Sequence, residues 1–189
     1  NYLAIATANG GTQLWSVKSK EPLFSIQYEI YQGVNDVAFA PDSKSFVIDR
    51  GNSIIGYDLE GKVILEMSTF HYEGIQAITF SKDGRYILSG GRDMTASVYD
   101  LQDSTYSRIQ GQFSPIAAVA ISPDNGLIAT GSEDGRIFIW DQYNDPQIVF
   151  QAHGEAVSGL RFSPDGNWLF SAGEEHARVW PTRRLDQSK

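Results

Sequence analysis

The stretch that decides the fold is Ile121–Asp141, which reads ISPDNGLIATGSEDGRIFIWD and sets short apolar runs between turn-forming residues. Pro123 presets φ at the first central position of a turn, and Gly126 is expected to accept a positive φ behind it. The same turn chemistry recurs at Pro164-Asp165-Gly166 and at Asp83-Gly84. The stretch therefore predicts short antiparallel strands joined by tight turns, in a unit that is repeated along the chain.

Two kinds of landmark give the period of this repeat. The residue before each turn recurs every 41 residues, at Phe39, Phe80, Ile121 and Phe162. The aromatic residue that closes each unit recurs every 40 to 42 residues, at Trp15, Tyr57, Tyr99, Trp140 and Trp180. A period near 40 that carries short strands is typical of a propeller array rather than a helical solenoid. The sequence thus predicts an all-β propeller with blades of four antiparallel strands.

The period also sets the expected domain organisation. Residues 1–180 are predicted to form one partial propeller, with blades at about 1–30, 31–70, 71–110, 111–152 and 153–180, and residues 181–189 a polar C-terminal tail. The first unit lacks an inner strand and the last lacks an outer one. About four and a half blades are therefore expected in this chain.

With these landmarks the chain resembles the WD40-repeat family. The family's Trp-Asp dipeptide occurs as Trp140-Asp141 and, in variant form, as Tyr57-Asp58 and Tyr99-Asp100. His71 and His153 stand nine residues before a pre-turn residue, where the family places its loop histidine. The resemblance implies the C-terminal part of a seven-bladed WD40 β-propeller, with roughly 100 further residues of blades upstream or on another chain.

Blades of this family often carry a buried hydrogen-bonded set of His, Ser or Thr, Asp and Trp. The resemblance implies such a set in the third blade, made of His71, Ser89, Asp93 and Tyr99. It implies partial sets of Thr130, Asp134 and Trp140, with Gln112 in place of His, and of His153, Ser171 and Trp180, with Glu174 or Glu175 in place of Asp. The second blade has Ile30 and Ile48 at the polar positions, so packing alone is expected to hold it.

Composition narrows the classes of partner. The 189 residues carry a net charge of −8, which argues against nucleic acid or an anionic membrane as the main partner. There is no cysteine, so neither a disulfide nor a thiolate metal site is available. No apolar run reaches the roughly 18 residues of a membrane span. We expect a cytoplasmic protein without cofactor or metal that binds a protein or peptide.

The resemblance also indicates where such a partner binds, since the face that carries the loop histidines is the usual partner surface of the family. It places there Tyr31, Arg50, Tyr72, Arg92, Phe113, Glu133, Glu155 and Glu174. Tyrosine and arginine are enriched at binding hot spots, although several of these residues could simply cap the blades. Arg161 alternates with Leu160 and Phe162 and is expected to point into the central channel, toward a buried carboxylate or an entering peptide or anion.

The sequence is compatible with three functions. The family resemblance implies a non-catalytic protein-interaction scaffold. The ARVWPT ending, which stops the array after a third strand, is similar to sensor or regulatory modules at the C-terminus of larger signalling or defence proteins of bacterial type. The third function is that of an enzyme, a propeller hydrolase or lyase. His71, Ser89 and Asp93 match the residue types of a hydrolase triad, but a triad is defined by its geometry. We expect these three groups to tie a loop to a turn, and we expect no enzyme activity.

Overall fold

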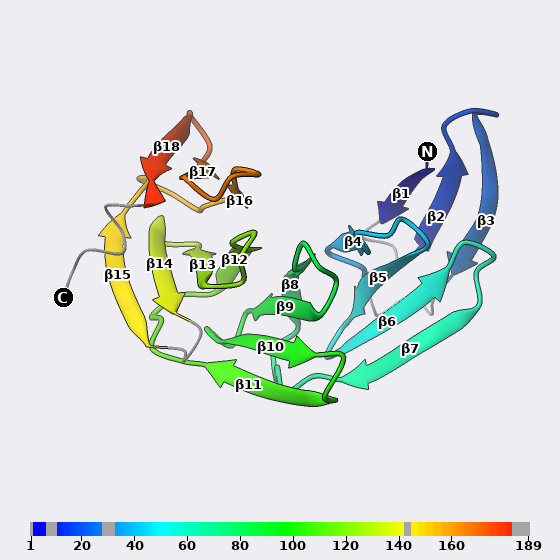
Figure 1. The fold of residues 1–189 in the computed structure, drawn as a ribbon, viewed down its shortest axis with the longest axis horizontal. Coiled ribbons are helices and arrows are strands. Elements are labelled where there is room, and N and C mark those ends of the chain that lie inside the picture. The colour runs from blue at the N-terminus through cyan, green and yellow to red at the C-terminus, as the bar shows by residue number, and fades with distance from the viewer. Residues whose placement is uncertain (1, 7–10, 28–32, 142–144, 183–189) are drawn as a thin grey trace.

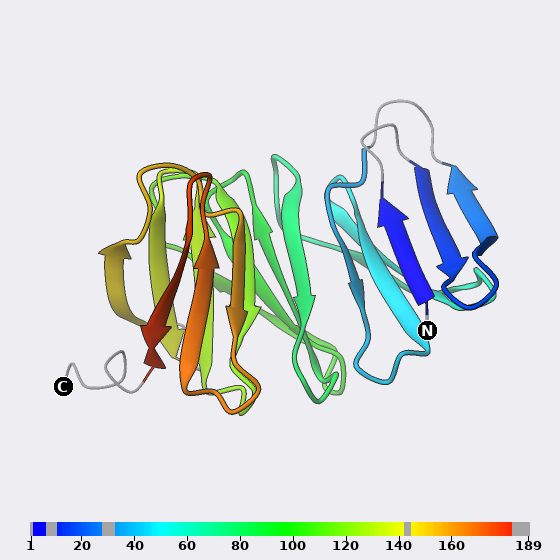
Figure 2. The ribbon, with the colours of Figure 1, turned by 90° about the horizontal axis from the view of Figure 1, so that it is seen from above.

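The computed structural model describes residues 2–6, 11–27, 33–141 and 145–182. In these residues the chain forms 18 strands, arranged in five antiparallel sheets that follow one another along an open arc (Figure 1). Seen from above, the sheets stand side by side as blades (Figure 2). The predicted all-β propeller architecture is confirmed.

Each blade is built from strands that are consecutive in the sequence. Blade 1 contains β1 (Tyr2–Ala6), β2 (Gly11–Ser16) and β3 (Glu21–Gln27). Blade 2 contains β4 (Val37–Phe39), β5 (Ser45–Arg50), β6 (Ser53–Asp58) and β7 (Val63–Ser68). Blade 3 contains β8 (Ile75–Phe80), β9 (Tyr86–Gly91), β10 (Ala96–Asp100) and β11 (Thr105–Ile109). Blade 4 contains β12 (Ile116–Ile121), β13 (Leu127–Ser132), β14 (Arg136–Asp141) and β15 (Pro146–Gln151), and blade 5 contains β16 (Gly159–Phe162), β17 (Trp168–Ala172) and β18 (Ala177–Pro181).

The turn between the first two strands of blades 3, 4 and 5 is built the same way each time. A serine hydroxyl donates to an aspartate two residues later at 2.5–2.6 Å, in the pairs Ser81–Asp83, Ser122–Asp124 and Ser163–Asp165. The residue after the aspartate has a positive φ, and in blade 4 this is Asn125 (+61°), not Gly126 as expected. Asparagine tolerates the left-handed region, so the turn needs no glycine there.

The hydrophobic core lies between blades rather than within them. One cluster of buried residues occupies each of the four junctions. At the junction of blades 4 and 5, for example, Ile137 and Ile139 pack with Val157 and Leu169. Each blade therefore needs a neighbour on both faces to bury its apolar side chains.

Two glycines show how closely the blades approach. A Cβ atom on Gly90 of β9 would lie 2.5 Å from Ile116 Cγ2, and a Cβ atom on Gly131 of β13 would lie 2.6 Å from Val157 Cγ1. Gly131 follows Gly90 by one period of 41 residues, and Val157 follows Ile116 by the same distance. The junction of blades 3 and 4 and the junction of blades 4 and 5 thus have the same packing, in which a branched side chain fills the space above a glycine. We call this contact the glycine joint.

Blade 2 is joined to blade 3 by polar contacts as well. The Asn35 side chain donates to the Ile75 carbonyl oxygen at 2.7 Å, and the Ile78 N–H donates to the Asp36 carboxylate at 2.8 Å. Asp49, at the end of β5, holds this loop by accepting the N–H groups of Asn35 (2.7 Å) and Asp36 (2.8 Å). Both carboxyl groups are largely buried, and burial raises the pKa of Asp49 to about 6.

These contacts correct the expectation that packing alone holds blade 2. Ile48 lies in the core as an apolar residue should, whereas Ile30 falls outside the described residues. The polar contacts come from the next residue, Asp49, which the family pattern does not mark. A buried carboxylate needs hydrogen-bond donors, and the loop before β4 supplies them.

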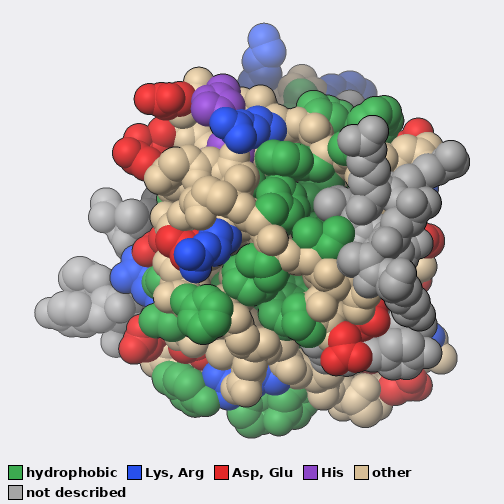
Figure 3. Space-filling view, turned by 90° about the vertical axis from the view of Figure 1, so that its left-hand side faces the viewer, with side chains coloured by type: hydrophobic (Ala, Val, Ile, Leu, Met, Phe, Trp, Pro, Cys, Tyr) green, Lys and Arg blue, Asp and Glu red, His purple; other side chains and the backbone are tan. Residues whose placement is uncertain are grey.

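The two ends of the arc expose apolar side chains that the inner blades bury. Tyr2, Leu3 and Ile5 are exposed on β1, and Trp168, Phe170 and Val179 are exposed on β17 and β18. Figure 3 views the molecule from the side of β15 and blade 5 and shows hydrophobic side chains spread over its surface.

The described part of the chain contains no helix with the length and hydropathy of a membrane span.

Candidate functional site

The loop face is the end of the arc formed by the connections β5–β6, β7–β8, β9–β10, β11–β12, β13–β14, β15–β16 and β17–β18. Seven of the eight residues predicted to bind a partner lie on it and are exposed: Arg50, Tyr72, Arg92, Phe113, Glu133, Glu155 and Glu174. Tyr31 lies outside the described residues. Antiparallel strands send every second connection to the same end of a sheet, which is why residues so far apart in sequence share one face.

Beneath this face in blade 3, a histidine joins a strand to a turn. His71 Nε2 lies 2.9 Å from Ser89 Oγ, and its Nδ1 lies 2.9 Å from Asp93 Oδ1. The Thr95 hydroxyl also donates to Asp93, at 2.8 Å. Although burial alone would raise it, the hydrogen bonds from His71 and Thr95 hold the pKa of Asp93 below its ordinary value. The structure thus brings together three of the four residues of the predicted set.

Tyr99 is the exception in this set. It is buried, and burial raises its pKa, although the neighbouring Ser97, Ser89 and Thr69 hydroxyls lower it; none of them lies in hydrogen-bond geometry with the Tyr99 hydroxyl. In blade 4 the indole N–H of Trp140, at the equivalent position, donates to Thr130 Oγ1 at 2.9 Å. The indole nitrogen lies on the side of its ring, whereas the phenol oxygen lies at the tip, so the Tyr99 hydroxyl meets the Ser89 hydroxyl with a different geometry. We therefore assign Tyr99 to the packing between blades 2 and 3.

Arg108, on β11, extends the blade 3 network to the surface. Its Nη2 lies 3.1 Å from Asp93 Oδ2, and its Nη1 donates to the Tyr72 hydroxyl at 2.6 Å. The guanidinium carbon also lies 4.7 Å from the centre of the Tyr72 ring. The backbone N–H of Tyr72 donates to Asp93 at 3.3 Å. Tyr72 is 70% exposed but is held at its backbone, its ring and its hydroxyl.

Blade 4 replaces the histidine with a glutamine. Gln112 Nε2 donates to Thr130 Oγ1 at 2.6 Å, which makes Thr130 the acceptor of both Gln112 and Trp140. Asp134 does not join them: it accepts the Ser132 hydroxyl at 2.6 Å and pairs with Arg136 at 3.2 Å. The second polar atom of the Gln112 amide is an acceptor oxygen, which cannot bond a carboxylate as the second N–H of an imidazole can, so the predicted set is split in two.

Blade 5 keeps the histidine but has no equivalent of Asp93. His153 Nε2 lies 2.8 Å from Ser171 Oγ, which also accepts the Trp180 indole N–H at 2.9 Å. Neither Glu174 nor Glu175 bonds His153 among the described residues. Their carboxyl groups are exposed, because the turn is one residue shorter than in blade 3 and leads them outward.

Charge is unevenly distributed over the loop face. Among the described residues of blades 2 and 3, exposed arginines occur at Arg50 and Arg92, beside the exposed Glu73. Exposed glutamates gather on blades 4 and 5, at Glu133, Glu155, Glu174 and Glu175. The Glu155 and Glu174 carboxyl groups are close enough that contact with Glu174 raises the pKa of Glu155. The face therefore presents an acidic half and a half with aromatic and basic groups.

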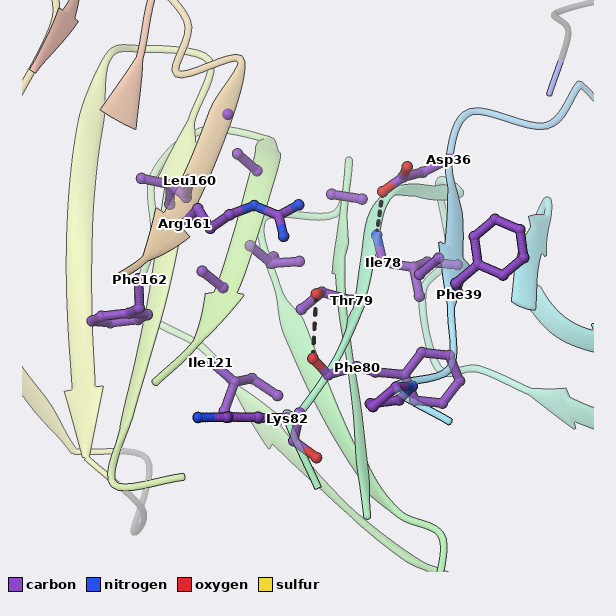
Figure 4. Close-up of a pocket in the computed structure, with 18 of the residues that line it drawn as sticks. Asp36, Phe39, Ile78, Thr79, Phe80, Lys82, Ile121, Leu160, Arg161 and Phe162 are labelled. Atoms are coloured by element: carbon purple, nitrogen blue, oxygen red, sulfur yellow. Dashed lines mark hydrogen bonds between the residues drawn. The ribbon is translucent and has the colours of Figure 1, made fainter. Parts of the chain in front are cut away.

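The inner strands β4, β8, β12 and β16 line a cavity of about 780 Å³, and Arg161 points into it (Figure 4). The carboxylate of Asp36 lines the same cavity but accepts the N–H groups of Val37 and Ile78. Arg161 makes no ion pair with any carboxylate in the described ranges. The channel position expected for Arg161 is therefore observed, and the carboxylate contact is not.

Sequence reasoning missed Arg108 and the Asn35–Asp36–Asp49 contacts. Arg108 shares the sheet face of Tyr99, two pairs along the β10–β11 ladder. The available signal was a charged residue on a face that packs against a neighbouring blade. Asp49 follows Ile48 in the run FVID, where a carboxylate directly after three apolar residues was the equivalent signal. A buried charge predicts a partner but does not say which one.

Comparison with known proteins agrees with this architecture. The family model described as "WD domain, G-beta repeat" (WD40) matches residues 63–100, 104–141 and 144–181, which together are more than half of the chain. Transducin beta-like protein 3 of Rattus norvegicus is 33% identical over 86 residues, 44% of this chain and 11% of that protein. Intraflagellar transport protein 122 homolog is 24% identical over 71 residues in Xenopus tropicalis (38% of this chain, 6% of that protein) and 26% over 66 residues in Homo sapiens (35% and 5%).

The chain thus matches only a small part of these relatives, at most 11% of their length. Three family repeats fall on three successive 41-residue units, and the strands of those units form antiparallel blades. The chain therefore belongs to the WD40-repeat family.

Proposed function

We propose that the chain is a non-catalytic interaction scaffold whose loop face binds a protein or peptide partner. The observation that carries this proposal is the presentation of two aromatic side chains, Tyr72 and Phe113, which are 70% and 76% exposed. Large aromatic residues at the centre of an interface supply much of its binding energy. Phe113 lies in the β11–β12 loop beside the buried Gln112, so its backbone is anchored while its ring faces water.

The fixation of Tyr72 supports the same proposal. Arg108 contacts both the ring and the hydroxyl of Tyr72, and Asp93 accepts its backbone N–H. A side chain that is already ordered loses little conformational entropy when a partner covers it, and immobilising a free side chain costs about 0.5–1.5 kcal/mol. The blade 3 hydrogen bonds thus prepare a binding group as well as stabilise the blade.

The test is to compare partner binding by wild-type protein with binding by Tyr72→Ala and Phe113→Ala. Each substitution is expected to weaken binding about tenfold or more, because hot-spot truncations cost about 2 kcal/mol. Glu60→Ala, an exposed residue between β6 and β7 at the opposite end of the blades, is the matched control and should bind as wild type does. Circular dichroism spectra must be the same for all variants. Equal affinity of all four proteins for the partner would refute the proposal.

The hydrolase alternative is weaker, because the Ser89 hydroxyl is buried. Ser89, His71 and Asp93 have the hydrogen bonds of a triad, but Ser89 and the Asp93 side chain are 0% and 2% exposed. A nucleophile must reach the carbonyl carbon of its substrate. We propose that the three groups are structural. The sensor-module alternative differs from the scaffold only in what adjoins the propeller, and sequencing the whole coding region separates the two.

We further propose that the exposed apolar faces of β1 and of β17–β18 pack against additional propeller blades, upstream in the same protein or on another chain. An uncovered sheet face and edge of this kind favour aggregation. Native mass spectrometry of the purified protein should show a species heavier than the 20.9 kDa of this chain. A stable 20.9 kDa monomer would be incompatible with it. The cytoplasmic location, and the absence of nucleic acid or membrane as main partner, stay predictions from the sequence.

A further inference from the structure

The histidines of blades 3 and 5 have the same surroundings except for the hydrogen-bond partner of Nδ1. In both, Nε2 lies within 2.9 Å of a serine hydroxyl, and a glycine packs against the other ring nitrogen: a Cβ on Gly91 would lie 2.4 Å from His71 Nδ1, and a Cβ on Gly173 would lie 2.6 Å from His153 Nδ1. In blade 3 a carboxylate bonds His71 Nδ1. In blade 5, His153 Nδ1 has no hydrogen-bond partner among the described residues, although the residue is 95% buried.

The position left open in blade 5 is a pocket. It has a volume of about 200 Å³ and is lined by His153, Gly154, Glu155, Glu174, Glu175 and His176. We name it the blade 5 pocket. In blade 3 the corresponding region is occupied by Asp93 and by Arg108 from the fourth strand, whereas β18 is the last strand described in blade 5.

One wall of this pocket is rigid. The backbone N–H of His153 donates to the Gly135 carbonyl at 3.0 Å, and the Gln151 side chain donates to the His153 carbonyl at 2.7 Å. The Ser171 oxygen has two lone pairs, which can accept N–H groups from both His153 Nε2 and Trp180. In that tautomer Nδ1 of His153, a residue that lines the pocket, carries a lone pair and is an acceptor.

The charge around the pocket is unbalanced in favour of a cation. The carboxyl groups of Glu155 and Glu174 lie close together, which destabilises the doubly charged state. Arg178 is the adjacent cation, with its Nε donating to His176 Nε2 at 2.9 Å, so one positive charge stands against the carboxyl groups of Glu155, Glu174 and Glu175. Burial, together with Arg178 and His176, lowers the pKa of His153, which keeps that imidazole neutral. Among the described residues, three carboxyl groups and the His153 imidazole thus line a pocket beside a single guanidinium, so negative charge and acceptors are in excess.

We propose that the blade 5 pocket takes the cationic end of a lysine or arginine side chain from the protein partner, with Glu155 and Glu174 as counter-charges and His153 Nδ1 as a hydrogen-bond acceptor. A primary ammonium or a guanidinium supplies several N–H donors and a positive charge, which is the complement of this lining. The proposal rests on the loop face being the binding face, and it names the chemistry of one contact there. Tyr72 and Phe113 would then supply apolar contacts on blades 3 and 4 while blade 5 selects a basic residue.

The test uses three small probes on the full chain: N-acetyl-lysine N-methylamide, its arginine analogue and its neutral norleucine analogue. Binding is followed by ¹⁵N NMR of the His153 ring and of the Gly154 and Gly173 amides. Saturable shifts are expected with at least one cationic probe and none with norleucine, and the two cationic probes show which side chain is preferred. Shifts with norleucine equal to those with lysine, or no shift with any probe, would overturn the proposal.

The variant for this test is Glu155→Gln/Glu174→Gln, which removes the charge but keeps the shape. Hydrogen bonds to charged groups contribute about 1.5–3 kcal/mol, so the dissociation constant should rise about tenfold or more. Glu60→Gln/Glu73→Gln removes the same charge from two exposed residues outside the pocket and should change the dissociation constant little. Unchanged binding to the Glu155/Glu174 variant would refute the pocket alone. Partner binding that still depends on Tyr72 and Phe113 would leave the scaffold function standing.

Discussion

The substitution Asp93→Ala removes the carboxylate on which the contacts of blade 3 converge. In the wild type, Asp93 accepts hydrogen bonds from His71 and Thr95 and pairs with Arg108 at 3.1 Å. Alanine would leave His71 Nδ1, in a side chain that is 0% exposed, with only the longer 3.2 Å contact to Thr95 Oγ1, and would leave the partly buried Arg108 without its counter-charge. Thr95 Oγ1 is the remaining polar neighbour of both groups in the described part of blade 3, and it carries no charge to replace the carboxylate.

The expected loss of unfolding free energy is about 3–5 kcal/mol, which is the usual cost of removing one partner of a buried charged pair. Folded domains are stable by only about 5–15 kcal/mol, so the effect should be large. Because hydrogen bonds lower the pKa of Asp93, its contribution is present above the ordinary carboxyl pKa and is lost as pH falls through the lowered value. The difference between wild type and variant should therefore shrink in acid.

Urea unfolding followed by tryptophan fluorescence measures this loss at neutral pH. Asp103→Ala is the matched control: Asp103 also bonds an arginine, Arg85, at 2.8 Å, but its side chain is 55% exposed. Solvent screens an exposed pair, so this variant should unfold close to wild type. If Asp93→Ala shifts the midpoint no more than Asp103→Ala, the Asp93 contacts do not stabilise the blade and the reasoning fails.

Two further predictions concern the blade junctions. Gly131→Ala puts a Cβ 2.6 Å from Val157 and should lower the unfolding free energy by about 1–3 kcal/mol through overpacking. Gly154→Ala is the control, because nothing lies within 4 Å of the new atom and the urea midpoint should stay unchanged. Equal midpoints for the two variants would contradict the close approach of blades 4 and 5. The folded-state pKa of Asp49 is about 6, above its ordinary value of 3.8, so its contribution to stability is complete below pH 3.8 and declines as pH rises through 6. Urea midpoints measured from pH 4 to pH 7 should show this decline in wild type and a smaller one in Asp49→Asn, where Asp36, whose pKa burial also raises, still titrates. Identical pH profiles would exclude Asp49 as a source of the decline.

The sequence was sufficient for the fold because the fold is periodic. The spacing of Phe80, Ile121 and Phe162 gives the blade length, and the strands lie where the apolar runs predict them. The exact turn geometry was less accessible: the positive φ of blade 4 falls on Asn125 rather than Gly126, because both residue types tolerate it.

The site was only partly predictable, since its decisive contacts join residues at distances that the period does not encode. Family spacing placed His71 next to Ser89 and Asp93, but Arg108 reaches Tyr72 from 36 residues away through side-chain length and direction. Likewise, spacing alone cannot show that Tyr99 fails to bond where Trp140 succeeds, because the difference depends on where the polar atom lies on the ring. Contacts of this kind depend on side-chain direction in the folded protein, which the spacing of residues in the sequence does not determine.

The glycine joint between blades has a consequence for how such chains change length. Gly90 receives Ile116, and Gly131, one period later, receives Val157 in the same way. Deleting one period, residues 91–131, would bring Gly90 opposite Val157 without creating a surface that the protein does not already contain. Duplicating the period would likewise join copies through a joint already in use. Recombination between repeats can therefore add or remove one blade length, because the blades that become neighbours meet through the same glycine contact.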